Sequence, residues 1–220
     1  MKTTTIWTCR FKEDYIMAAI TARDYFNKNA TVLYDTREKE NFEYLKALKH
    51  MGLIIERTTF KSGDYSFRID GKDYRNEWLG ERKGSMSELY GNVMAKNKDK
   101  ASAERNNLEE ECKRVKDAGV KEFVLFIEGT RSLYEARHTR LSAASVRGND
   151  AGRHIYSTLL SWACNNRYGF KTVCNLSQYD LAVEMADMMY YYWRNEMIAA
   201  HGKDFIKKIT ENRNGQSERI

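Results

Sequence analysis

Residues 80–89 read GERKGSMSEL, and this stretch decides the fold that we expect for the chain. A strand from about Tyr74 to Lys83 leads into it, and side chains two positions apart on a strand point to the same face. Glu81 and Lys83 therefore project together, whereas Arg82 points to the opposite face. The segment predicts a carboxylate and an ammonium group side by side near the end of one strand.

The residues that precede this strand alternate between strand and helix patterns. Residues 32–35, VLYD, form a short apolar run that ends in a charge, which is typical of a buried strand with a functional residue at its tip. Residues 39–52 have apolar side chains at every third position, which predicts a helix. β-Branched residues in 53–60 and strict alternation in 65–70 predict two more strands.

The residues that follow predict helices around a central strand. Ser85 and Glu88 have the spacing of a capping box, so we expect Ser85 to begin a helix. FVLFI at 123–127 is a continuous apolar run, which is typical of a strand that is buried on both faces. Apolar spacing predicts further helices around 108–118, 156–163 and 181–192, a strand at 171–175, and a polar loop with some helix at 129–153.

Together these elements predict an α/β protein in which helices flank a central mixed sheet in a single domain. We expect the domain to comprise residues 31–200. Residues 1–30 would be an N-terminal extension that is helical around Tyr15 to Phe26, and residues 201–220 would be a flexible, basic and polar tail.

The composition is that of a globular protein with an excess of basic residues. The 220 residues carry a net charge of +6 and have a pI near 9.0, which favours a polyanionic partner. No apolar run approaches the roughly 18 residues that a membrane helix needs, and the amino terminus lacks a signal-peptide pattern, so we expect an intracellular protein without a membrane partner. The four cysteines are widely spread, which predicts neither a zinc site nor a disulfide framework.

Three acidic residues, Asp35, Asp64 and Glu81, stand at the ends of predicted strands. Carboxylate oxygens suit Mg²⁺ or Mn²⁺, which are hard cations that proteins bind mainly through oxygen. Such a cation would polarise a phosphodiester, while Lys83 would orient a water molecule or neutralise charge on the phosphate. The spacing Asp-x(16)-Glu-x-Lys alone also occurs on many strands whose charges are simply a solvated face.

The sequence around these acidic residues makes the pattern more specific. LYDTRE at 33–38, GDYSF at 63–67 and GERKGSMSEL at 80–89 occur in the order of the XPF-type nuclease domain, which the chain resembles. This family belongs to the PD-(D/E)xK restriction-endonuclease-like superfamily. KEFVLFIEG at 121–129 is similar to the short phage and bacterial members. The resemblance covers about residues 31–195 and implies a restriction-endonuclease-like sheet.

The resemblance also implies an activity: a structure-selective DNA endonuclease that requires Mg²⁺ or Mn²⁺ and cuts branched or flapped DNA near single-strand to double-strand junctions. Asp35, Asp64 and Glu81 would bind the metal or position its ligands, and Lys83 would be the catalytic lysine. DNA repair, recombination or phage DNA processing, in the cytoplasm of a bacterial or phage-infected cell, would fit such an enzyme.

The flanking positions include two family arginines and two departures from the family pattern. Arg37 and Arg82 match arginines of the first and third motifs, which would contact phosphate or brace the acidic cluster. The family commonly has an aspartate four residues after the lysine, where this chain has Ser87. Glu88 either replaces that aspartate or serves only the capping box. Gly80 stands where a β-branched residue is usual, and would weaken the strand by about 0.5–1 kcal/mol.

Basic residues gather after the catalytic strand and in the polar loop, where contact with DNA phosphates would require them. A solvated helix face or surface loop is the alternative for each of them. No helix-hairpin-helix module is evident, so DNA contact would come from the nuclease domain itself, from the second copy in a homodimer, or from a separate protein. The residues that we expect to bind DNA are Lys96, Lys98, Lys100, Arg105, Arg140 and Arg147.

Two other functions are compatible with the same residues. Ser87 and Gly80 also suit a catalytically inactive nuclease fold that acts as a DNA-binding scaffold and binds branched DNA without cutting it. A sequence-specific restriction enzyme on the same fold would instead produce discrete fragments from long duplex DNA.

Overall fold

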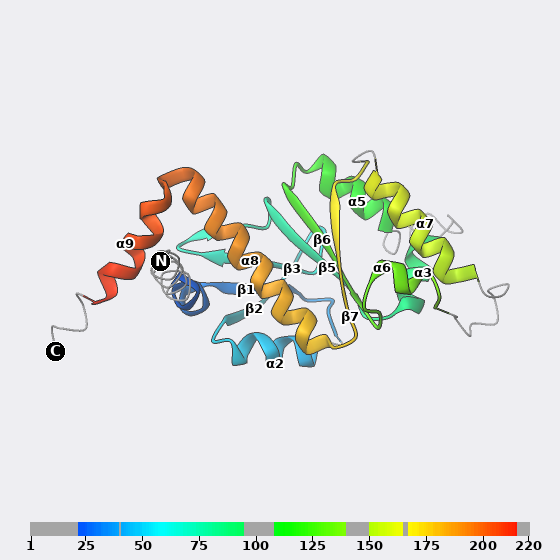
Figure 1. Cartoon of the computed structure of the whole chain (residues 1–220), viewed down its shortest axis with the longest axis horizontal. Helices are drawn as coiled ribbons and strands as arrows, with labels where there is room; N and C mark the ends of the chain where they lie inside the picture. Colours follow the sequence, from blue (N-terminus) through cyan, green and yellow to red (C-terminus); the bar gives the residue numbers. More distant parts are fainter. Residues whose placement is uncertain (1–21, 40, 95–107, 140–149, 165–166, 215–220) are drawn as a thin grey trace, which may run out of the picture.

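A mixed sheet forms the centre of the molecule (Figure 1). The computed structural model describes residues 22–39, 41–94, 108–139, 150–164 and 167–214. In these segments the strands follow the order β2-β1-β3-β5-β6-β7, and the short β4 pairs with β3. β3 is antiparallel to its neighbours, whereas β1 and β2, β5 and β6, and β6 and β7 are parallel. The strands are β1 (Thr31–Asp35), β2 (Ile54–Thr58), β3 (Tyr65–Ile69), β4 (Lys72–Asp73), β5 (Trp78–Lys83), β6 (Glu122–Glu128) and β7 (Phe170–Asn175).

Helices cover both faces of this sheet, which confirms the predicted fold class. α8 crosses the sheet in front of the strands in the view of Figure 1. α7 lies with α3 and α6 at the right-hand end of the molecule in the same view. The helices are α2 (Phe42–His50), α3 (Met86–Met94), α5 (Leu108–Asp117), α6 (Leu133–Ala136), α7 (Ala151–Ala163), α8 (Gln178–His201) and α9 (Lys203–Asn214).

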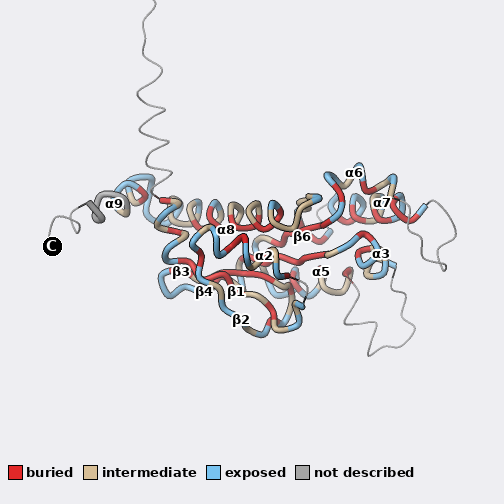
Figure 2. Tube along the Cα trace, turned by 90° about the horizontal axis from the view of Figure 1, so that it is seen from below, coloured by how far each residue is buried: buried red, intermediate tan, exposed pale blue. Residues whose placement is uncertain are grey.

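The two faces of the sheet bury separate hydrophobic clusters, and β6 contributes to both. Val124 and Phe126 belong to a first cluster, whereas Phe123, Leu125 and Ile127 belong to a second cluster, as the alternation of a strand requires. α2 and α8 cover the first cluster, and α3, α5 and α7 cover the second. Buried residues therefore run along the strands and along α8 (Figure 2). The continuous apolar run of β6 was correctly predicted to be buried on both faces.

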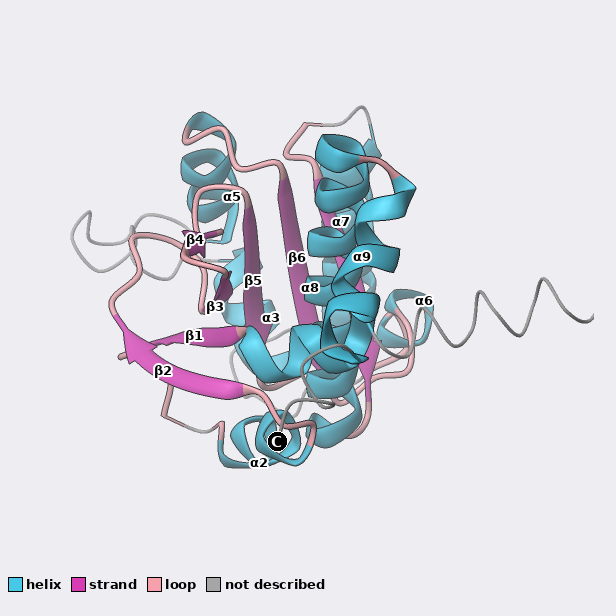
Figure 3. Ribbon diagram, turned by 90° about the vertical axis from the view of Figure 1, so that its left-hand side faces the viewer, coloured by secondary structure: helices cyan, strands magenta, loops and turns pink. Residues whose placement is uncertain are grey.

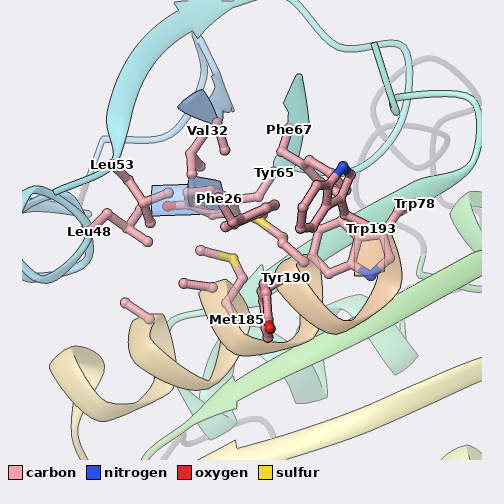
Figure 4. Packing of buried hydrophobic residues seen from close by; sticks show 14 of the residues in the cluster. Phe26, Val32, Leu48, Leu53, Tyr65, Phe67, Trp78, Met185, Tyr190 and Trp193 are labelled. Atoms are coloured by element: carbon pink, nitrogen blue, oxygen red, sulfur yellow. The ribbon is translucent and has the colours of Figure 1, made fainter. Parts of the chain in front are cut away.

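Residues 22–30 belong to the first cluster and not to a separate extension. Residues 22–29 are helical, and Phe26 is fully buried. Its ring centroid lies 5.8 Å from that of Phe67, 5.7 Å from Tyr190 and 5.6 Å from Trp193, so this aromatic group joins a strand to α8 (Figure 4). The helix thus completes the core of the domain, which the sequence analysis began at residue 31.

Two further segments differ from the sequence-based expectation. Residues 203–214 form α9 where we expected a flexible tail, because Ile206 is buried in the first cluster and Phe205 packs beside it. The predicted strand from Tyr74 to Lys83 is interrupted, since the Asp73 side chain accepts a hydrogen bond from the Arg75 N–H at 2.9 Å and turns the chain. The strand resumes at Trp78 as β5, beside β6 (Figure 3).

Three of the four cysteines lie in the described segments, and each is a free thiol. Cys112 is buried, whereas Cys164 is exposed. In the same segments no helix has both the length and the apolar character needed to cross a bilayer.

Gly80, the position at which the resemblance implied a β-branched residue, lies against two buried aromatic rings. A Cβ atom at this position would be 3.0 Å from Cε2 of Phe126 and 3.3 Å from Cη2 of Trp78. Both rings are fully buried, so the close packing around them opposes the shift that an added Cβ atom would require. The glycine therefore fits this core, and a β-branched residue would not.

We expect Gly80→Ala to reduce the free energy of unfolding by about 1–3 kcal/mol, because the added methyl group overpacks the core. Thermal unfolding would measure this as a loss of roughly 2–4 °C per kcal/mol. Gly91→Ala is the matched control: Gly91 lies in α3 with open space around its position, so the same change should stabilise the helix by up to about 1 kcal/mol. Equal effects of the two substitutions would contradict the packing argument.

Candidate active site

Asp64 stands at the point where β3 and β5 separate. The ladder between these two fully described strands has a single pair, Tyr65 with Gly80. The Asp64 N–H donates to the Gly80 carbonyl at 2.8 Å, and its Oδ2 accepts a hydrogen bond from the Arg82 N–H at 2.9 Å. Its own carbonyl accepts from the Asp35 N–H at 2.8 Å. Asp64 thus joins β1 to β5 and replaces the missing ladder bond with its side chain.

Glu81 and Lys83 lie side by side on β5, as their spacing predicted. Glu81 is 4% exposed and Lys83 is 5% exposed. The Lys83 Nζ donates to Glu81 Oε1, so the two charges are paired inside the protein. Both side chains line the same cavity as Asp64. With Arg37 and Arg82, which line the same cavity, the structure brings together five of the six catalytic residues that we selected from the sequence.

Arg82 makes a separate set of contacts that holds the strand in place. Its Nε donates to Glu128 Oε1 at 2.6 Å, and its Nη1 donates to Glu38 Oε2 at 3.0 Å. Glu128 is held in turn by the Gln178 side chain at 2.8 Å, while the Arg82 guanidinium lies 5.2 Å from the centre of the Tyr44 ring. We expected Arg82 to contact phosphate or to brace the cluster of Asp35, Asp64 and Glu81; its side chain instead contacts Glu38 and Glu128, which were not among the selected residues.

Asp35 does not line the cavity. It is fully buried, and its carboxylate accepts hydrogen bonds from the N–H and Nε of Arg37 at 2.7 Å and from the Phe60 N–H at 2.7 Å. The Nη2 of Arg37 adds a fourth bond at 3.1 Å. Arg37 lines the cavity, and its side chain is 64% exposed. Asp35 therefore contacts the cavity lining through Arg37, and its expected role, to bind the metal or to position its ligands, stays a prediction.

The cavity has a volume of about 540 Å³ and is lined almost wholly by charged side chains. Glu111 of α5 is one that the sequence analysis missed, and its Oε1 accepts a hydrogen bond from the Gly63 N–H at 2.9 Å, directly before Asp64. Five acidic and five basic residues leave no excess positive charge in the lining. The lining residues are Arg37, Glu38, Lys61, Asp64, Glu81, Arg82, Lys83, Glu88, Asn92, Glu111 and Arg114.

Glu88 serves the cap of α3, as the capping-box interpretation proposed. The Glu88 N–H donates to Ser85 Oγ at 3.1 Å, and Glu88 Oε2 accepts from the Gly84 N–H at 2.9 Å. Its Oε1 lies 3.7 Å from Lys83 Nζ. Glu88 is thus held at the edge of the cavity by backbone contacts, and Ser87 brings no carboxylate to the site.

The ionisable groups of the cavity shift one another's pKa values. Burial, together with the nearby Glu38 carboxylate, raises the pKa of Asp64 to about 7. Burial and the Asp64 charge also raise the pKa of Glu81 well above its usual value. Burial alone would lower the pKa of Lys83, but Glu81 and Asp64 outweigh it and raise that pKa, so Lys83 stays protonated. Without a counter-cation, the site therefore favours protons on its carboxylates.

The donor chemistry of Asp64 and Glu81 can be compared with what a divalent cation requires. Asp64 uses Oδ2 for the Arg82 N–H, and Glu81 uses Oε1 for Lys83, so one oxygen of each makes no hydrogen bond within the described part of the chain. No cluster of three or more His, Cys, Asp or Glu among the described residues is suited to hold a metal ion. Mg²⁺ is commonly bound by one or two carboxylates together with waters and substrate phosphates, so this donor set suits it.

The residues that we expected to bind DNA lie outside the described segments. This applies to Lys96, Lys98, Lys100, Arg105, Arg140 and Arg147, so their role remains a prediction from the sequence.

A comparison with protein-family models matches a segment of the chain that contains all the residues of this cavity. The model of the ERCC4 domain matches residues 34–179, which include every residue of the cavity lining. The chain belongs to the ERCC4-domain family of XPF-type nucleases. This establishes the family that the sequence motifs suggested, and the ERCC4 domain supplies both β5 and the residues that Arg82 contacts.

Solved structures of XPF are similar to this chain, and the DNA-bound one shares its fold. XPF from Aeropyrum pernix is 17% identical and has a TM-score of 0.49, over 81% of this chain and 72% of that one. XPF from Aeropyrum pernix in complex with DNA is 14% identical and has a TM-score of 0.51, over 76% of this chain and 66% of that one. The chain thus spans about two thirds of the DNA-bound XPF chain. A comparison with curated proteins gave no match.

The raised pKa of Asp64 predicts how the stability of the metal-free protein depends on pH. Asp64 binds a proton more tightly in the folded protein than in the unfolded chain, where its pKa is near 3.9. Its favourable contribution is therefore present below about pH 4 and is lost as the pH rises through 7. Asp64→Asn, which keeps an acceptor for the Arg82 N–H, should raise the melting temperature in EDTA at pH 8 but not at pH 4.5.

Thermal unfolding of wild type and variant over this pH range checks the prediction. Asp117→Asn is the control, because Asp117 is exposed on α5 outside the cavity. Parallel pH profiles for wild type and Asp64→Asn would show that Asp64 has an ordinary pKa in the folded protein.

Proposed function

We propose that this chain is an endonuclease that uses Mg²⁺ or Mn²⁺ to hydrolyse phosphodiester bonds of branched DNA near single-strand to double-strand junctions. The observation that carries the proposal is the convergence of Asp64, Glu81 and Lys83 on one cavity in an ERCC4 domain. Two carboxylates with free oxygens beside a buried lysine are the groups that metal-assisted phosphodiester hydrolysis needs.

The charge balance of the cavity supports the requirement for a cation. Its five acidic and five basic residues balance when all of them are ionised, so the lining then presents no excess positive charge to a phosphodiester. Asp64 and Glu81 would hold the cation, which when bound polarises the phosphate and promotes ionisation of a water molecule. Burial and the neighbouring carboxylates raise the pKa of both Asp64 and Glu81, so protons bind them in the absence of a cation, and a divalent cation would take the place of those protons.

The other residues of the site would position the reacting groups. Lys83, which stays protonated beside Glu81, would donate a hydrogen bond to the attacking water or to a phosphate oxygen as negative charge builds up. Arg37, held by Asp35, presents an exposed guanidinium at the edge of the cavity and would contact a neighbouring phosphate. Arg82 stays committed to Glu38 and Glu128 and would keep β5 in register.

DNA is the substrate that the family and the charge favour. The net charge of +6 and pI near 9.0 suit a polyanion, and one of the similar XPF structures is a complex with DNA. The preference for branched forms, and a role in repair, recombination or phage DNA processing, rest on the family resemblance. A DNA-binding scaffold without activity is the second candidate, because Ser87 stands where the family commonly has an aspartate and the neighbouring Glu88 is engaged in the cap of α3.

Glu81→Gln tests the catalytic proposal with little change in shape. Glutamine keeps an acceptor for Lys83 but removes the charge that would bind the cation. We expect cleavage to fall by at least about 100-fold, which is the effect of removing one electrostatic contact from an active site. Labelled flap, fork, Holliday-junction and plain duplex DNA, incubated with Mg²⁺, Mn²⁺ or EDTA, would measure the loss and rank the substrates.

Glu56→Gln is the matched control, because Glu56 pairs with Arg68 on the surface and does not line the cavity. It should cleave like the wild type. Metal-dependent cleavage that survives in both Glu81→Gln and Asp64→Asn would overturn the assignment. Tight binding of branched DNA by the wild type, with no cleavage in either cation, would instead favour the scaffold.

A further inference from the structure

An exposed aromatic and cationic group lies at the end of the molecule formed by α6 and α7. Tyr134 of α6 is 58% exposed, and the Arg137 guanidinium lies 4.6 Å from the centre of its ring. The ring centroids of His138 and Tyr156 lie 5.8 Å and 6.3 Å from that of Tyr134, both nearly perpendicular to it. We call Tyr134, Arg137, His138 and Tyr156 the aromatic platform.

The platform is held rigidly although α6 has a single turn. Ser132 caps the helix by accepting a hydrogen bond from the Glu135 N–H at 3.0 Å, and Glu135 accepts one from the Arg131 N–H at 3.0 Å. The turn that follows is pressed against α7 at Gly152, where a Cβ atom would lie 2.2 Å from the carbonyl oxygen of Ala136. α6 is therefore seated on α7, as Figures 1 and 2 show from two directions.

The platform is also connected to the candidate active site, once through the end of β6 and once through the packing of α7 on α3. Tyr134 follows Glu128 by six residues, and Glu128 binds Arg82 of β5 at 2.6 Å. Six residues span at most about 20 Å, so Tyr134 lies no farther than that from Glu128. This distance corresponds to roughly six nucleotides of a stacked strand. α7, which carries Tyr156, packs against α3, and α3 carries Glu88 and Asn92 of the cavity wall.

Another exposed tyrosine of the described segments differs in its surroundings. Tyr191 of α8 is 56% exposed, and its ring contacts Tyr190 at 5.0 Å. No arginine or lysine covers the Tyr191 ring in the part of the chain that the structure describes. An aromatic ring beside a guanidinium is a combination that binds unpaired nucleobases, because bases stack on the ring and the cation attracts both the base and the phosphate.

We propose that the aromatic platform stacks unpaired bases of a single-stranded DNA arm within a few nucleotides of the bond that enters the cavity. The inference rests on the proposed nuclease function and specifies the element that would recognise the single-stranded side of a junction. Stacking on Tyr134 needs no particular base, so the site would select unpaired DNA and not a sequence.

Fluorescence anisotropy of the full chain in EDTA tests this without any cleavage. The probes are a duplex with a single-stranded arm of 0, 2, 4, 6 or 10 nucleotides, and the same arms built from abasic sites, which keep the phosphates and lack the bases. The wild type should bind the normal six-nucleotide arm about 5- to 150-fold more tightly than the abasic arm, which is the range for one stacked base. Tyr134→Ala should bind both arms equally, and Tyr134→Phe should keep the wild-type preference.

Tyr191→Ala is the matched control and should behave as the wild type. An equal preference for normal over abasic arms in wild type and Tyr134→Ala would overturn the proposal, as would a wild type that does not distinguish the two arms. The double variant Tyr134→Ala/Tyr156→Ala should bind the two arms as Tyr134→Ala does, and a preference that is lost only in the double variant would contradict stacking on Tyr134. Because the assay contains no divalent cation, a failed cleavage assay would leave this result interpretable on its own.

Discussion

Three consecutive charges buried in one strand constrain the rest of the structure. Glu81, Arg82 and Lys83 are each at most 7% exposed, and a buried charge costs several kcal/mol unless it is paired. The strand directs Arg82 away from its two neighbours, so the pairing must be solved separately on each side. Glu81 and Lys83 pair with each other at the cavity, whereas Arg82 needs Glu38 after β1 and Glu128 at the end of β6. These contacts tie β5 to the end of β6 and to the segment that follows β1.

Asp64 stands where the buried charges of β5 face the cavity. β3 and β5 separate after a single ladder pair, and the Asp64 side chain satisfies the Arg82 N–H that the ladder leaves without a partner. The same gap admits Glu111 from α5 and leaves a cavity lined by charges. An aspartate at this position therefore has a structural function as well as the proposed chemical one, and its raised pKa reflects the burial that the structural function imposes.

Local patterns in the sequence predicted the strands, most of the helices and the side-by-side placement of Glu81 and Lys83. These features depend on period-2 and helical spacing, which neighbouring residues determine. The sequence analysis missed Glu38, Glu128 and Glu111, because their roles depend on contacts across 44, 46 and 48 positions of the chain. We expected Asp35 to bind the metal or to position its ligands. The motif around Asp35 does not show that its carboxylate is occupied by hydrogen bonds from Arg37 and Phe60. Phe26 was assigned to an extension because nothing local shows that it packs against α8.

The central claim is that Asp64 and Glu81 bind the divalent cation, whereas Asp35 holds Arg37. Mn²⁺ binding tests this claim most directly. Proton relaxation or electron paramagnetic resonance of Mn²⁺ would be titrated with wild type, Asp64→Asn, Glu81→Gln and Asp35→Asn, each shown to be folded and free of DNA. The account predicts that Asp64→Asn and Glu81→Gln weaken binding by at least about tenfold, whereas Asp35→Asn binds like the wild type. A loss in Asp35→Asn equal to that in the other two variants would contradict it.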